Sequence, residues 1–317
     1  MDTIPSLELI HQAHQRIKPF IHRTPVMTSE IIDDAAGCSI YFKCENFQKV
    51  GAFKMRGASN ALLSLPATKI TRGVATHSSG NHAQALAKAA ANVGCKAYIV
   101  MPDRAPDVKV NAVKAYGAEI FFCKSTQQAR EQTLRTVIKE TGATFIHPYD
   151  DYEIISGQAT AAAELIDEVD HLDILVAPVG GGGLLSGTSL AAHYLLPDAE
   201  VIGAEPLGAN DAFRSLESGM IHPSIEPQTI ADGLLTSLSE RTFGIIKEHV
   251  KQIITVSDPD IIHAMRMIWE RMKIVVEPSA AVALASVLSK PAPFSGKKVG
   301  VILSGGNVDL EKLPFLD

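Results

Sequence analysis

An apolar run, Ile174–Val179, leads directly into four consecutive glycines, Gly180–Gly183, and a helix-like segment opens immediately after them. This order of strand, glycine loop and helix predicts an α/β fold, whose ligands bind at the carboxyl ends of the strands. Without Cβ atoms, consecutive backbone N–H groups can approach one anion, and the helix adds the positive end of its dipole. A tight turn would explain one or two glycines but hardly four, so we interpret the loop as a phosphate cradle.

The glycine loop has neither the Lys-Ser/Thr ending of a nucleotide P-loop nor the spacing of a dinucleotide fingerprint, so a single phosphate fits it better. Two similar turns follow other apolar runs. Ser78–His82 comes after Val74–His77, and Ser304–Asn307 comes after Val299–Leu303. Hydroxyl and amide side chains gathered at strand ends predict a polar cofactor that is held by many short contacts.

Short runs of β-branched and aromatic residues alternate with helix-like segments along the chain. This alternation predicts βα units and mostly parallel sheets that helices cover on both faces. Apolar residues at helical spacing clearly predict two helices. One helix begins at Asn81. The other begins after Ser257, its expected N-cap, and its apolar stripe extends to Met272. The expected strands are Ser39–Lys43, Val74–His77, Ala97–Met101, Glu119–Phe122, Ile174–Ala177, Val201–Ala204, Ile253–Val256 and Val299–Leu303.

The length of 317 residues is near the practical limit of a single core, so two lobes are expected. No linker rich in proline, serine or charge separates two halves, which indicates that one lobe is inserted within the other. We place a small mobile lobe at 51–149 and a large cofactor-binding lobe at 1–50 and 150–317.

Composition excludes several classes of protein. Hydrophobic residues make up 46% and charged residues 20%, which is typical of a compact fold and not of a disordered chain. A net charge of −6 without a basic stripe argues against nucleic acid as a partner. No apolar run reaches the roughly 20 residues that span a bilayer, and no signal pattern opens the chain. The four cysteines form no C-x-x-C pair, so we expect reduced thiols and a cytoplasmic protein.

Lys54 is placed between Phe53 and Met55. Partial desolvation disfavours a charged ammonium group, so such an amine can act as a nucleophile or form a Schiff base with a carbonyl compound. A lysine beside apolar residues more often extends its amine to solvent, so this position alone leaves both interpretations open.

Six motifs resemble those of serine racemases and catabolic serine/threonine dehydratases, in the same order and at similar spacing. They are FKCENFQKVGAFKMRGA, SSGNHAQALA, the GGGG loop, ADG at 231–233, VVEPSAAVALA and LSGGNVD. That family uses pyridoxal 5'-phosphate (PLP) and has the tryptophan synthase β-like fold, called fold type II. The resemblance covers nearly the whole chain, and it implies that Lys54 binds the cofactor covalently.

The resemblance implies further cofactor contacts. Phe53 would pack beside the cofactor ring, Asn81 would bind the 3-hydroxyl group, and Ser304 would face the pyridine nitrogen. A hydroxyl, unlike a carboxylate, does not compel protonation of that nitrogen, which favours elimination and proton exchange over transamination. The backbone contacts would come from Gly180, Gly181, Gly182 and Gly183 around the phosphate, and from Leu184 and Gly233 close to the cofactor.

Ser79 bears on the type of reaction, because serine racemases have SSGNH where many threonine dehydratases have SAGNH. Racemisation needs a group on each face of the Cα atom, so Lys54 and the Ser79 hydroxyl would form a two-base pair. Ser79 could instead only bind a substrate carboxylate or the helix start. Ser78, Asn81 and His82 belong to the same expected substrate loop.

Two more sites follow from the resemblance. Glu205, the Ala209 carbonyl and Asp211 resemble a divalent-cation site, and their oxygen donors suit Mg²⁺, Ca²⁺ or Mn²⁺. An ordinary acidic helix start is the alternative. Arg130 corresponds to an arginine that approaches a dicarboxylate inhibitor in serine racemase, and a guanidinium suits a second carboxylate. A solvated helix arginine is the alternative there. The family also implies a homodimer.

The first hypothesis is therefore a PLP-dependent serine racemase and L-serine/L-threonine ammonia-lyase, which gives D-serine, keto acid and ammonia. The enzymatic alternative is a 3-hydroxyaspartate dehydratase, which gives oxaloacetate and ammonia. The alternative from another class is a catalytically silent regulatory protein that retains the fold and binds PLP or another ligand.

Overall fold

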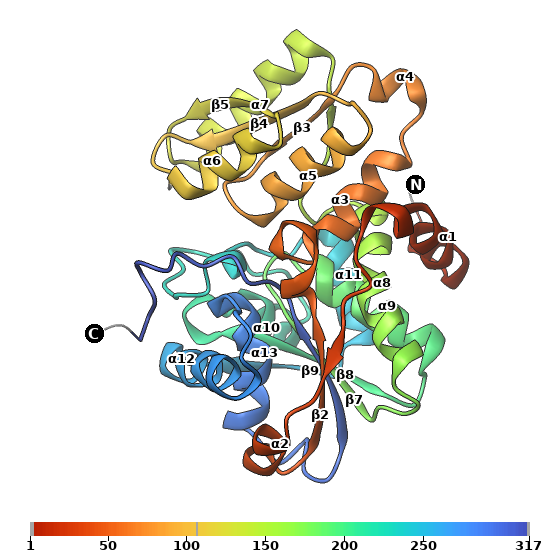
Figure 1. Cartoon of the computed structure of the whole chain (residues 1–317), viewed down its shortest axis with the longest axis vertical. Coiled ribbons are helices and arrows are strands. Elements are labelled where there is room, and N and C mark those ends of the chain that lie inside the picture. Colours follow the sequence, from red (N-terminus) through yellow and green to blue (C-terminus); the bar gives the residue numbers. More distant parts are fainter. Residues whose placement is uncertain (1–2, 106, 316–317) are drawn as a thin grey trace.

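Two sheets organise the chain in a computed structural model that describes residues 3–105 and 107–315. They lie one above the other in Figure 1. The larger sheet has the order β1 (Val26–Met27), β2 (Ser39–Cys44), β10 (Lys298–Leu303), β7 (Ile174–Pro178), β8 (Glu200–Pro206) and β9 (Gln252–Val256). The smaller sheet has the order β5 (Glu119–Cys123), β4 (Ala97–Pro102), β3 (Val74–His77) and β6 (Thr144–Phe145). The strand pairs are parallel except for β1 with β2.

All eight expected strands are present, within two residues of their expected ends. The sequence pattern did not reveal β1 and β6, because each has only two residues and shows no alternation. In the larger sheet β10 lies between β2 and β7, so chain segments from both ends meet at its centre: Val301 pairs with Phe42 on one side and with Val176 on the other.

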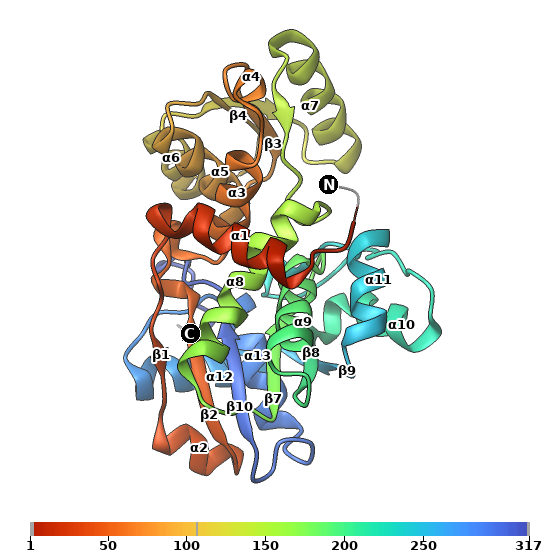
Figure 2. The same cartoon turned by 90° about the vertical axis from the view of Figure 1, so that its right-hand side faces the viewer.

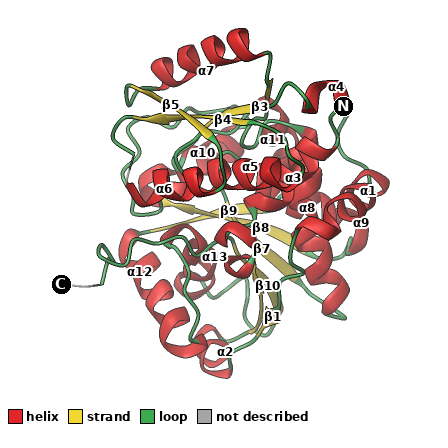
Figure 3. Cartoon of the chain, turned by 45° about the horizontal axis from the view of Figure 1, so that its top comes forward, coloured by secondary structure: helices red, strands yellow, loops and turns green. Residues whose placement is uncertain are grey.

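Helices cover both faces of the larger sheet, as a parallel sheet requires (Figure 3). One face packs against α2 (Glu30–Ala36), α12 (Asp258–Met267) and α13 (Pro278–Ser289). The other face packs against α1 (Leu7–Ile17), α8 (Tyr152–Glu168), α9 (Gly183–Leu195), α10 (Asp211–Ser218) and α11 (Glu240–His249).

The smaller sheet is covered in the same way (Figure 2). One face packs against α3 (Lys54–Leu63), α5 (Asn81–Asn92) and α6 (Asp107–Ala115), and the other packs against α7 (Gln127–Thr141). The short helix α4 (Ala67–Ile70) precedes β3. The strands β3 to β6 all fall within 51–149, the range expected for the inserted lobe. The boundaries of the two lobes stay a prediction. Within the described ranges, no helix is both long and apolar enough to cross a membrane.

The two helices marked in the sequence are confirmed, with one correction. The expected stripe of α5 is buried, and Ser257 caps α12 through a capping box with Asp260. The segment that carries the second stripe is not a single α-helix, however. Its last part, Ile268–Met272, forms a π-helical turn, which ends at Lys273 with a φ of 60°. In this wider turn the Trp269 indole N–H donates to the Val276 carbonyl at 3.0 Å.

A wholly buried ionic network joins β2, α3 and α8. The guanidinium of Arg56 donates to both carboxylates that face it, with distances of 2.8 Å to Glu45 and 2.7 and 2.9 Å to Glu164. The amine of Lys43 lies 2.8 Å from Glu164 as well. Burial would raise the pKa of Glu164, but hydrogen bonds from His14 and Arg56 hold it below its usual range. The network fixes the first helical turn after Lys54 against the larger sheet.

Candidate active site

A cavity of about 990 Å³ is lined by residues at the carboxyl ends of strands in both sheets, among them His77 as the last residue of β3, Pro178 as the last residue of β7, and Ser304 directly after β10. Most residues expected from the sequence meet there. Phe53, Lys54, Ser78, Ser79, Asn81, His82, Arg130, Gly180, Gly181, Gly182, Gly183, Leu184, Gly233 and Ser304 line the cavity, whereas Glu205, Ala209 and Asp211 do not.

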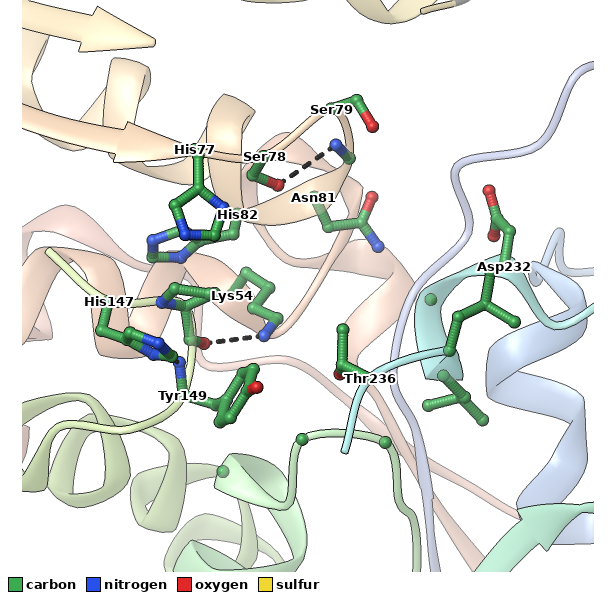
Figure 4. Close-up of a pocket in the computed structure, with 18 of the residues that line it drawn as sticks. Lys54, His77, Ser78, Ser79, Asn81, His82, His147, Tyr149, Asp232 and Thr236 are labelled. Carbon is green, nitrogen blue, oxygen red and sulfur yellow. Dashed lines mark hydrogen bonds between the residues drawn. The ribbon is translucent and has the colours of Figure 1, made fainter. Parts of the chain in front are cut away.

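Lys54 is the first residue of α3, and its amine lies inside the cavity (Figure 4). The Nζ atom donates to the Pro148 carbonyl at 2.9 Å and lies 5.1 Å from the centre of the Phe53 ring. Burial lowers the pKa of Lys54 to about 8, although the negative charge of Glu277 opposes this shift. A considerable fraction of the amine is therefore neutral in mildly alkaline solution and can act as a nucleophile.

The turn before Lys54 is fixed to the end of β10. The Phe53 N–H donates to the Ser304 carbonyl at 3.0 Å, and Ala52 forms an isolated bridge with Gly305. These contacts hold Ser304, whose side chain carries a hydroxyl group, close to Lys54, the expected cofactor lysine.

The glycine loop connects β7 to α9, and each of its four glycines is required by packing. A Cβ atom at Gly180 would lie 2.9 Å from Leu234, and one at Gly181 or Gly183 would meet Tyr149. Gly182 has a φ of 88°, which only glycine adopts readily. The turn itself accounts for Gly182 alone, in agreement with the expectation that a tight turn explains only one or two glycines; the close approach of Leu234 and Tyr149, which the sequence did not reveal, accounts for the others.

The same loop still fits an anion. Among the described residues, no hydrogen-bond acceptor faces the backbone N–H groups of Gly180, Gly181, Gly182 or Gly183. Unpaired N–H groups at the start of a 13-residue helix carry partial positive charge and suit the oxygens of one phosphate.

The loop between β3 and α5 forms the opposite wall. Ser78 accepts a hydrogen bond from the Gly80 N–H at 3.3 Å, and Figure 4 shows Ser79 well apart from Lys54. His82 donates its Nε2–H to the Ile146 carbonyl at 3.2 Å, since a carbonyl can only accept. Burial, with the charge of Lys54, lowers the pKa of His82 well below its usual value, so this imidazole is neutral.

Many residues that line the cavity were not proposed as site residues from the sequence, and four of them carry polar groups that matter below. His147 and Tyr149 follow β6, a two-residue strand that no sequence run marks, while Glu277 and Asn307 lie inside quoted motifs without a distinguishing signal. The Nδ1 atom of His147 accepts from the N–H groups of Tyr149 and Asp150 at 3.2 and 2.8 Å, so its proton is on Nε2. Burial lowers the pKa of His147 to about 4, which makes it a neutral donor.

Arg130 lies on α7 at the cavity wall, and its Nε atom is buried without a hydrogen-bond partner in the described part of the chain. The positive charge of Arg130 and burial both lower the pKa of nearby His77, and burial is the larger cause. A donor group without a protein acceptor beside a cavity fits an anionic ligand group.

The carboxylates expected to bind a metal lie at the end of β8. Both oxygens of Glu205 accept backbone N–H groups, from Ala212 and Phe213, at 2.8 Å. The Oδ2 atom of Asp211 is buried and has no partner in the described ranges. Burial raises the pKa of Glu205 to about 8 and that of Asp211 to about 6. No three His, Cys, Asp or Glu side chains cluster as metal ligands over those ranges, so a cation would also need backbone oxygens.

A family model described as "Pyridoxal-phosphate dependent enzyme" matches residues 17–305. The chain belongs to this family. It is 50% identical to the beta-hydroxyaspartate dehydratase of Paracoccus denitrificans over 312 residues, which cover 98% of this chain and 99% of that protein. It is also 50% identical to the serine racemase of Dictyostelium discoideum, over 97% of this chain and 96% of that protein.

Solved structures of PLP-dependent relatives have the same fold. The crystal structure of the Dictyostelium discoideum serine racemase gives a TM-score of 0.93 over 96% of this chain and 99% of that one. The crystal structure of T.th. threonine deaminase gives a TM-score of 0.92 at 43% identity, over 96% and 99% of the two chains. The chain is therefore a PLP-dependent enzyme of fold type II, and the catalytically silent alternative is not supported.

Proposed function

We propose that this enzyme is a serine racemase and L-serine/L-threonine ammonia-lyase, with Lys54 as its cofactor lysine and base. The observation that carries the proposal is the Lys54 amine, which is partly buried, has a lowered pKa, and shares one cavity with a loop of unpaired N–H groups. The serine racemase and threonine deaminase among the relatives support the same substrate class.

Several residues would hold PLP in this cavity. Lys54 would bind its aldehyde carbon, the Gly180–Gly183 loop its phosphate, and Phe53 would pack beside its ring. Asn81 would donate to the ring 3-oxygen, and the Ser304 hydroxyl would face the ring nitrogen. Leu184 and Gly233 would complete the walls.

PLP, when bound, withdraws electrons from the substrate and makes its Cα proton acidic. With PLP bound, the Lys54 amine would remove that proton, because it is partly neutral near its lowered pKa. Ammonia-lyase activity then needs loss of the β-hydroxyl with a proton as water, and later hydrolysis gives keto acid and ammonia. His82 does not compete as a base, since its Nε2 holds a proton for Ile146 and burial opposes its protonation.

We propose that Ser79 is the second base of the racemase. The variant Ser79→Ala is expected to lose D-serine formation by about 10²-fold or more, because one face of the Cα atom would have no proton donor. Dehydration of L-serine should be nearly unchanged, since it needs only Lys54. D-serine and keto acid are measured from the same reaction. Equal loss of both products would show that Ser79 only binds substrate.

The observation that favours the second candidate function is Arg130. A 3-hydroxyaspartate dehydratase must bind a second carboxylate, and Arg130 offers a buried N–H without a protein acceptor, among the described residues, at the cavity wall. The relative in Paracoccus denitrificans carries that activity in its name. Incubation with L-serine, L-threonine and the isomers of 3-hydroxyaspartate, followed by assay of D-serine, keto acid and oxaloacetate, decides between the candidates by their kcat/KM values.

We propose a divalent cation, Mg²⁺ or alternatively Ca²⁺ or Mn²⁺, bound by Glu205, the Ala209 carbonyl and Asp211. The unpartnered Asp211 oxygen and the two close carboxylates fit such an ion. Saturating Mg²⁺ is expected to raise the free energy of unfolding by about 2–3 kcal/mol at a hundredfold excess over the Kd. Thermal melts with Mg²⁺ and with a chelator measure this. Asp211→Asn should remove the difference, and identical melts of the parent enzyme would refute the site.

We also propose a cytoplasmic homodimer whose small lobe, at 51–149, moves relative to the large lobe. The ion pair of Lys109 with Asp232, at 2.6 Å, joins α6 to the Asp232–Leu234 turn at the cavity, so it would have to break for the lobes to separate. Light scattering measures the proposed dimer directly.

A further inference from the structure

The amide of Asn81 is held by two neighbours that also line the cavity, Glu277 and Asn307. Its Nδ2 atom donates to the carboxylate of Glu277, at 2.9 Å from Oε1 and 3.2 Å from Oε2. Its Oδ1 atom accepts from the Nδ2 atom of Asn307 at 2.9 Å. Glu277 is the N-cap residue of α13 and Asn307 follows β10, so two segments that belong to the larger sheet and its helices hold a residue at the start of α5.

The direction of these hydrogen bonds is set by groups that can only accept. The second acceptor of Asn307 Nδ2 is the Val50 carbonyl, at 2.8 Å. Because this carbonyl can only accept, the atom of Asn307 that faces it must be the NH₂ nitrogen. The same nitrogen also lies against Asn81, so the Asn81 atom on that side must be the oxygen. At the other end, burial raises the pKa of Glu277 to about 7, so in mildly alkaline solution its carboxylate is ionised and also only accepts. Asn81 therefore has its oxygen toward Asn307 and its NH₂ toward Glu277, and the opposite amide orientation is excluded.

One N–H bond of Asn81 remains available. The two N–H bonds of an amide diverge too widely for both to reach one carboxylate, so only one hydrogen is taken by Glu277. The described residues provide no other acceptor for Asn81 Nδ2, and Asn81 lines the cavity. The remaining N–H is therefore a donor for a ligand in the cavity.

The turn that supplies the Val50 carbonyl is strained. Val50 has a φ of 60°, which is rare for a β-branched residue, and Gly51 has a φ of 69°. A Cβ atom at Gly51 would lie 2.6 Å from the Asn307 oxygen. The backbone thus adopts an unfavourable conformation that leaves room for the Asn307 side chain and directs a carbonyl at it.

We propose that Glu277 and Asn307 are positioning residues that fix the Asn81 amide, so that its free N–H donates to the ionised 3-oxygen of the PLP ring. The inference rests on the proposed cofactor site at Lys54. In the opposite orientation Asn81 would present its carbonyl oxygen to the ring oxygen, and two acceptors would repel. Asn307 therefore acts on cofactor affinity only through Asn81.

The test is a double-mutant cycle on the dissociation constant of PLP, measured by visible absorbance in mildly alkaline buffer. Asn307→Leu removes both donors of the Asn307 amide, and Asn81→Ala removes the amide that it orients. Each single variant is expected to bind PLP about tenfold more weakly. In the Asn81→Ala background, Asn307→Leu should cause no further loss, because the group through which it acts is gone.

Asn111→Leu, at an exposed position of α6, is the matched control and should leave the dissociation constant unchanged. If Asn307→Leu does not fold, as judged by circular dichroism, Glu277→Asp takes its place, because it keeps the charge and withdraws the acceptor from Asn81. The inference would be overturned if the increases in the PLP dissociation constant of the two single variants multiplied in the double variant. It would also be overturned if each single variant bound PLP as tightly as the parent enzyme. A parent enzyme that binds no PLP would instead refute the proposed function.

Discussion

Replacing Lys54 with alanine is expected to abolish covalent binding of PLP and to lower the rate of keto acid formation by about 10³-fold to 10⁴-fold. The amine is the nucleophile for the cofactor aldehyde and the base for the Cα proton, and both roles end with its removal. No neighbour in the described part of the cavity replaces it, since burial keeps His82 neutral and holds the pKa of His147 at about 4. Visible absorbance of the purified protein and a keto acid assay measure the two losses.

Lys69→Ala is the matched control for that variant. Lys69 is exposed on α4, away from the cavity, so its removal should leave absorbance and rate unchanged. A Lys54→Ala protein that stays yellow and keeps most of its activity would exclude Lys54 as the cofactor lysine.

Arg56→Met is expected to lower the free energy of unfolding by about 3–5 kcal/mol. The substitution keeps much of the length of the side chain but leaves Glu45 and Glu164 buried without the guanidinium that donates to both. Lys43 can neutralise only one of the two carboxylates, since its amine contacts Glu164 and not Glu45. Denaturant unfolding, followed by circular dichroism, measures the change.

Arg266→Met is the control for the charge change. Arg266 is exposed and pairs with Glu270, one helical turn further along the chain, so its loss should cost less than about 1 kcal/mol. Similar effects of Arg56→Met and Arg266→Met would show that the buried network contributes no more than a surface ion pair.

The sequence predicted the parallel strands well because most are buried runs of β-branched and other apolar residues between turn signals, although β5 is largely exposed or half-buried. Val74–His77 was predicted with its observed bounds, and Ile174–Ala177 was short by one residue. The π-helical turn at Ile268–Met272 was not predicted, because an apolar stripe has nearly the same spacing in both kinds of helix. Tertiary contacts, such as that of Trp269 with Val276, are not visible in spacing.

The glycine loop was predicted from the signal of its own segment, whereas Lys54 alone left two interpretations open and was assigned through the resemblance of six motifs. The candidate site was missed where the role of a residue depends on distant partners. Glu277 and Asn307 acquire their importance only when the fold brings them to Asn81. The four consecutive glycines show a different limit of the sequence. The run indicated an anion, whereas contacts with Leu234 and Tyr149 and the φ of Gly182 favour glycine independently of any ligand.

The position of the covalent cofactor bond tests the account most directly. Borohydride reduces the bond between PLP and its lysine to a stable secondary amine, so the modified residue can be identified by peptide mass mapping. The reduced enzyme is expected to carry one pyridoxyl phosphate group per chain, on the peptide that contains Lys54. A group on any other lysine, or a reduced protein without the added mass, would contradict the proposed active site.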